Sequence, residues 1–118
     1  MIKGGVETIV GGLNDAIFGP IVMFGIGGIF VETLKDVSFR VSPIDDNDAD
    51  EMIREIKGYP ILEGSRGLER SDISALNKVI RNVSKIMIEN PKISQLDLNP
   101  VAVFNKGVSV LDARMILK

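Results

Sequence analysis

The residues best suited to chemistry lie near the end of the chain, in two apolar runs that a turn separates. Residues 95–103 read Gln-Leu-Asp-Leu-Asn-Pro-Val-Ala-Val, and residues 108–114 read Val-Ser-Val-Leu-Asp-Ala-Arg after a turn at 105–107. We expect two adjacent strands that bring Asn99 close to Asp112. Mg²⁺ prefers hard oxygen ligands, such as an amide oxygen and a carboxylate, together with phosphate oxygens. The pair therefore indicates a magnesium site and nucleotide chemistry.

Each of these candidates also has an ordinary structural explanation. Asn99 would shape an Asn-Pro turn, and Asp112 would cap a neighbouring backbone group. Arg114 lies two residues beyond Asp112 on the same strand face, so it would contact a phosphate or form an ion pair. Gly27 and Gly28 would either let backbone N–H groups approach a phosphate or form a tight turn between strands.

Other charged residues give weaker signals. Arg40 alternates with apolar neighbours, which points it off the core face, toward either a cleft or a surface ion pair. Glu32 either faces the phosphate end of a cleft or is a charge at a strand edge. Glu7, at the head of the first strand, is a weak candidate for the nucleotide side, and Arg66 receives no assigned role. Four acidic residues resemble a metal cluster but suit the start of a helix better; they are Asp45, Asp46, Asp48 and Asp50.

Composition excludes several kinds of site. The chain has 118 residues, a net charge of −2, and neither cysteine nor histidine. This length suits one domain with one core. Disulfides, thiolate or imidazole metal sites and a phosphohistidine cannot come from this chain. The lack of basic clusters predicts no nucleic-acid partner. The lack of a clean apolar span or signal peptide predicts a cytoplasmic protein outside the membrane.

The pattern of apolar residues predicts a β-rich first half, two helices and two closing strands. We expect strands at 7–11, 21–24, 29–32 and 37–41, and a helix at 46–57. A second helix at 72–90 carries one apolar stripe, with Ser71 or Asp72 as its N-cap. This order predicts an α+β fold in which two helices lie on one face of a mostly antiparallel sheet.

Several segments together resemble one family. Residues 4–11, 18–32 and 34–40, with the closing segments 96–100 and 111–114, resemble the ATP-grasp β subunit of ADP-forming acyl-CoA synthetases. The closing segments also resemble the related succinyl-CoA synthetase β subunit. The resemblance covers essentially the whole chain. It implies that residues 1–118 form the second subdomain of an ATP-grasp fold, with Mg²⁺ on Asn99 and Asp112 and with ADP or ATP as the nucleotide. Rich isoleucine content is compatible with a thermophilic source.

The resemblance also implies a reaction and its partners. The family converts acyl-CoA, ADP and phosphate to the acid, CoA and ATP, with a phosphohistidine on a CoA-binding α subunit or domain. We expect the front lobe of the ATP-grasp fold to be missing from this chain, which alone would be inactive. An uncovered cleft face would favour homo-oligomers. Gln95 stands where the family usually has an acid. The alternatives are another type of ATP-grasp carboxylate ligase, or a non-catalytic regulatory or assembly module.

Overall fold

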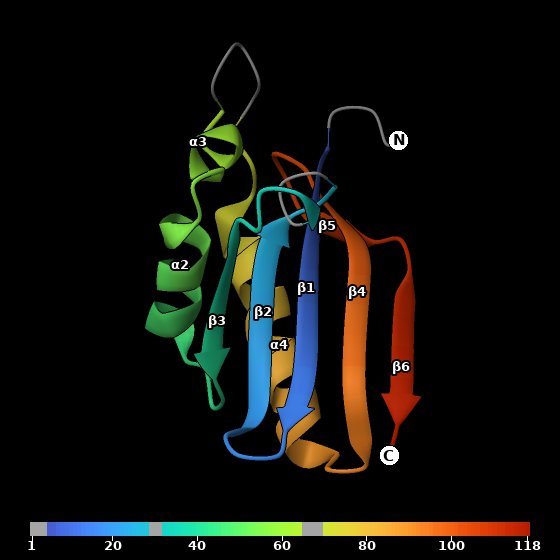
Figure 1. Ribbon diagram of the computed structural model, residues 1–118. Coiled ribbons are helices and arrows are strands. Elements are labelled where there is room, and N and C mark those ends of the chain that lie inside the picture. The colour runs from blue at the N-terminus through green and yellow to red at the C-terminus, as the bar shows by residue number, and fades with distance from the viewer. Residues whose placement is uncertain (1–4, 29–31, 65–69) are drawn as a thin grey trace.

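A single antiparallel sheet organises the chain (Figure 1). The computed structural model describes residues 5–28, 32–64 and 70–118, which contribute six strands to this sheet. The strands run in the order β3-β2-β1-β4, and both β5 and β6 pair with the remaining side of β4. Their bounds are β1 Val6–Asp15, β2 Gly19–Ile26, β3 Val37–Val41, β4 Ile93–Val103, β5 Val108–Val110 and β6 Ala113–Leu117.

The helices cover one face of the sheet and leave the other uncovered. They are α2 Asp46–Glu55, α3 Tyr59–Leu62 and α4 Ile73–Glu89. In Figure 1, α4 crosses behind β1 and β2, and α2 lies beside β3. The predicted fold class is confirmed. The short α3 was not predicted, because Pro60 resembles a helix breaker, although proline is tolerated in a first turn. Within the described residues, no helix is long and apolar enough to cross a membrane.

The apolar stripe of α4 builds the core. Leu76, Ile80, Val83 and Met87 are buried, as the sequence predicts, and Asp72 is the N-cap. These side chains belong to one buried cluster with side chains of α2 and of the covered sheet face. Its other fully buried large members are Val10, Val22, Phe24, Met52, Ile53, Leu62, Val101 and Val103.

Strand β3 is oriented opposite to the prediction for Arg40. Phe39 pairs with Met23 and is 54% exposed on the uncovered face, whereas Ser38 is buried toward the helices. Arg40, on the same side as Ser38, forms an ion pair with Glu55 of α2, and this interaction raises the pKa of Arg40. The expectation that Arg40 points off the core face is therefore wrong, whereas the surface ion pair expected as one alternative is present. Alternation defines two strand faces, but it does not identify which one the helices cover.

Two predicted strands also need revision. Most of the strand predicted at 29–32 lies outside the described residues, and so does Arg66. Glu32 itself is helical, and its N–H donates to the carbonyl of Gly28 at 3.1 Å. The strand predicted at 108–114 is divided into β5 and β6, with Leu111 and Asp112 between them.

Asp72 joins the start of α4 to the turn between β4 and β5. Its carboxylate accepts hydrogen bonds from the N–H groups of Gly107 at 2.7 Å and Ala75 at 3.0 Å. Its own N–H donates to the carbonyl of Phe104 at 2.7 Å. The bonds from Gly107 and Ala75 lower the pKa of Asp72 below its ordinary value.

We predict that Asp72 makes stability depend on acid. Because its pKa is lower in the folded state, its contribution is present above the ordinary pKa of 3.8 and is lost as the pH falls through the lowered value. Asp72→Asn keeps a capping oxygen but removes the charge. Urea unfolding at about pH 7 and about pH 3 should show a smaller acid loss in Asp72→Asn than in the wild type. Equal losses would contradict the prediction, and Glu89→Gln, an exposed carboxylate on α4, is the control.

Candidate functional site

The pairing along one side of β4 is interrupted beside Asn99, and Asp112 lies at this interruption. We call this place, with Asn99 and Asp112, the junction. β5 ends at Val110 and β6 begins at Ala113, so the edge of the sheet is interrupted opposite Asn99 and Pro100. The N–H of Asn99 donates to the carbonyl of Asp112 at 3.1 Å, and the N–H of Leu111 donates to the carbonyl of Pro100 at 3.0 Å. The structure thus brings Asn99 and Asp112 side by side, as expected. Asp112, however, lies in a break between β5 and β6 and not within a continuous strand.

Both side chains at this junction are available to a ligand. Asn99 and Asp112 are exposed, and neither side chain makes a hydrogen bond within the described residues. The alternative in which Asp112 caps a backbone group therefore finds no support there. No cluster of three or more acidic, histidine or cysteine side chains suits a metal among the described residues. An amide oxygen and one carboxylate fit a Mg²⁺ ion that takes its other ligands from phosphate and water.

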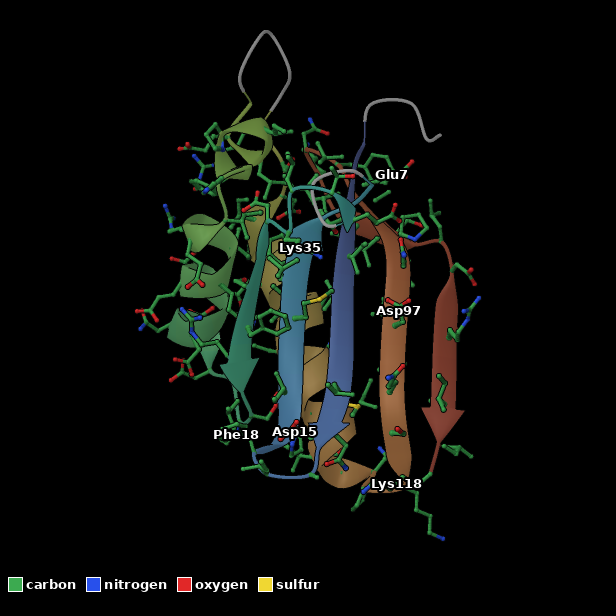
Figure 2. The ribbon with its side chains drawn as sticks, in the orientation of Figure 1. Glu7, Asp15, Phe18, Lys35, Asp97 and Lys118 are labelled. Carbon is green, nitrogen blue, oxygen red and sulfur yellow. The ribbon has the colours of Figure 1, made fainter. Side chains whose placement is uncertain are left out.

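A row of side chains crosses the uncovered face toward this junction. Paired residues place Phe39, Met23, Gly11, Asp97 and Arg114 in line across β3, β2, β1, β4 and β6. The row is apolar at its β3 end and charged at its β6 end. Figure 2 looks onto this face and shows Asp97 on β4.

Arg114 and Asp97 supply the charges at that end. Within the described residues, the ion pairs involve only Arg40 and Arg54, so Arg114 holds its exposed guanidinium free of a carboxylate partner there. Asp97 was missed by sequence reasoning. Asp97 could have been found from its position two residues before Asn99, because residues two apart in a strand lie on the same face.

A shallow hollow of about 260 Å³ lies along the same row. Its lining is mostly apolar, with Asp97 and Gln95 on one side, and consists of Gly11, Gly12, Leu13, Ile21, Met23, Phe39, Gln95, Leu96 and Asp97. A Cβ at Gly11 would meet only ordinary contacts, at 3.5 Å from the carbonyl oxygen of Leu96 and 3.9 Å from Met23. Glycine there keeps the floor of the hollow flat without being required by packing.

The glycine turn after β2 has two interpretations from the sequence, a phosphate contact or a tight turn. The N–H of Gly27 donates to the carbonyl of Glu7 at 2.9 Å, so it is not free for an anion. Gly28 has a φ of 73°, a conformation that glycine adopts readily in a tight turn. The side chain of Glu32 is exposed. The turn interpretation fits Gly27 and Gly28, and Arg40 is already engaged with Glu55 on the other face.

The acidic group at the start of α2 forms a helix cap. The Asp45 side chain accepts from the N–H of Asp48 at 2.8 Å, and the Asp48 side chain accepts from the N–H of Asp45 at 3.2 Å. Asp50 forms an ion pair with Arg54 at 2.7 Å. These contacts agree with the structural explanation expected from the sequence.

Similarity to known proteins extends over the whole chain. A family model described as an ATP-grasp domain matches residues 1–117. The β subunit of acetate–CoA ligase [ADP-forming] I from Pyrococcus furiosus is 54% identical over 117 residues, which are 99% of this chain and 50% of that relative. Acetate–CoA ligase [ADP-forming] I from Archaeoglobus fulgidus is 50% identical over 99% of this chain and 17% of that relative.

A solved structure has the same fold. It is the dinucleotide forming acetyl-coenzyme A synthetase 1 of Ca. Korarchaeum cryptofilum, in complex with coenzyme A and Mg-AMPPCP. The two chains superpose with a TM-score of 0.95 at 49% identity, over 100% of this chain and 55% of that one. These similarities confirm the resemblance inferred from the sequence. The chain spans half or less of the curated relatives described above.

We predict that the junction side chains are dispensable for folding. Asn99→Ala and Asp112→Ala should each change the free energy of unfolding by less than about 0.5 kcal/mol, because both side chains are exposed. Urea unfolding followed by circular dichroism measures this. A loss above about 1 kcal/mol, the size of a lost capping bond, would instead assign them a structural role.

Proposed function

The chain belongs to the ATP-grasp domain family, and from this premise we propose that it forms the Mg²⁺- and nucleotide-binding part of an ADP-forming acyl-CoA synthetase. The whole enzyme would convert acyl-CoA, ADP and phosphate to the acid, CoA and ATP. One observation carries the proposal. The break in the sheet places Asn99 and Asp112 together, with free oxygen atoms, at the charged end of an uncovered face.

The polarity of that face suits a nucleotide. The amide oxygen of Asn99 and the carboxylate of Asp112 would hold Mg²⁺, which neutralises phosphate charge when bound. Arg114 would donate charge-assisted hydrogen bonds to phosphate oxygens. Asp97 pairs with Arg114 across the strands without forming an ion pair within the described residues, so the guanidinium is free for a phosphate. The apolar hollow around Met23 would pack against the flat face of a base.

The phosphoryl group would be transferred by positioning and electrostatics rather than by a nucleophile of this chain. The sequence has no histidine, so a phosphohistidine would have to come from outside these 118 residues. The Korarchaeum structure is described with its phosphohistidine segment pointing towards the nucleotide binding site. We propose that a CoA-binding α subunit or domain carries the corresponding histidine here, and that a front lobe closes over the uncovered face. The relatives favour this activity over another carboxylate ligase.

We predict that Mg²⁺–ADP and Mg²⁺–ATP bind when the uncovered face is completed. Titration calorimetry should show binding for this chain mixed with a front-lobe polypeptide, and much weaker binding for the chain alone. Asp112→Ala should weaken binding in the mixture by more than about 10-fold, because even changes outside the metal ligands cost that much.

Glu89→Ala is the matched control, since it removes an exposed carboxylate from the last residue of α4, before β4 begins at Ile93. It should bind as the wild type does. Absence of binding in the wild-type mixture would overturn the proposal and favour a non-catalytic module. Equal binding by Asp112→Ala and wild type would overturn the metal assignment.

A further inference from the structure

β4 is irregular on its β1 side as well as at its edge. Thr8 pairs with Val101, whereas Val10 pairs with Leu98. Two residues of β4, Asn99 and Pro100, therefore stand opposite Ile9 alone. This arrangement is a β-bulge, a feature that redirects side chains and is frequent beside functional sites.

Thr8 lies beside this bulge on the neighbouring strand β1 and forms a side-chain hydrogen bond to β4. It is the last residue of β1 in register before the shift, and it is fully buried. Its hydroxyl donates to the carbonyl oxygen of Val101 at 2.9 Å, which joins the two strands through a side chain. Proline has no N–H, so Pro100 cannot contribute a backbone donor at this level. A side-chain donor thus reinforces the ladder beside the residue where a backbone donor is lost.

Asn99 and Pro100 form backbone hydrogen bonds on the other side of β4. Asn99 and Pro100 bond to Asp112 and Leu111 there, and these bonds set the junction. We propose that Thr8 is a positioning residue that fixes the bulge and thereby holds Asn99 beside Asp112 for the metal. The effect of Thr8 on metal binding rests on the proposed function, whereas the bulge and the hydrogen bond from Thr8 do not.

Three variants separate positioning from general stability. Thr8→Val keeps the shape of the side chain and removes the donor, which leaves the buried Val101 carbonyl without that bond. Thr8→Ser keeps a hydroxyl and should restore wild-type behaviour. Ser38→Ala is the matched control, because the buried Ser38 hydroxyl donates to the Met52 carbonyl at the same distance of 2.9 Å, on the helix side of β3.

The first measurement is amide hydrogen exchange on this chain. In Thr8→Val, the amides of Asn99 and Leu111 should exchange about 10-fold faster relative to core amides of β2, the factor expected for one lost buried bond. Thr8→Ser and Ser38→Ala should leave that ratio unchanged. An unchanged ratio in Thr8→Val, or an equal increase in Ser38→Ala, would overturn the positioning role.

The second measurement is the Mg²⁺ requirement for ADP binding by the chain mixed with a front-lobe polypeptide. Thr8→Val should raise the half-saturating Mg²⁺ concentration by about 10-fold, with ADP binding recovered at high Mg²⁺. Ser38→Ala should leave it unchanged. The failures are distinguishable. A wild-type mixture that binds no Mg²⁺–ADP overturns the proposed function, whereas normal wild-type binding with an unchanged requirement in Thr8→Val overturns the role of Thr8.

Discussion

Proline at position 100 removes one backbone donor from the longest strand of the sheet, and the geometry around it adapts to that loss. β4 pairs with β1 on one side and with β5 and β6 on the other, so it is an interior strand. Proline within a sheet is found at edges, strand starts or bulges. Beside Pro100, the pairing with β1 shifts register on one side of β4, and on the other side β5 ends before β6 begins. Asn99, directly before the proline, is thereby placed beside Asp112.

The rest of the fold keeps this junction accessible while holding it in place. α4 buries its apolar stripe against the far face, so the core does not depend on the face that carries Asn99. Asp72 joins α4 to the turn that precedes β5, which connects the rigid helix to the edge near the junction. The uncovered face keeps large exposed side chains such as Phe39, Val41 and Leu13. Large exposed apolar patches are typical of surfaces that bind a ligand or a partner.

Periodicity and local turn chemistry made much of the fold predictable. The stripe on α4 and an N-cap at Ser71 or Asp72 follow from spacing and residue type alone, and the structure selects Asp72. The face on which Arg40 lies did not follow from the sequence, because strand alternation does not say which face the helices cover. The hydrogen bond from Ser38 to Met52 shows that polar residues of β3 face the helices. The break after Val110 was hidden because the run from Val108 is mostly apolar and carries no glycine or proline. Its cause lies in a different strand, at Pro100.

The proximity of the two main candidate residues was predictable from the sequence, whereas their metal role stays a prediction. Asn99 and Asp112 were found from residue type, and the backbone bond between them gives that pairing a physical basis. The two alternatives for Gly27 could not be separated from the sequence, because its N–H donates to the Glu7 carbonyl, a contact between distant segments that no local pattern reveals. Asp97 and Thr8 were overlooked because their significance depends on strand register.

The central claim is the location of the metal, and paramagnetic broadening tests it most directly. Mn²⁺ would replace Mg²⁺ on the chain mixed with a front-lobe polypeptide and ADP, since both ions favour oxygen ligands. The account predicts that the amide signals of Asn99, Leu111 and Asp112 broaden first. Broadening centred instead on Asp45 and Asp46 at the start of α2, with the junction signals intact, would contradict it.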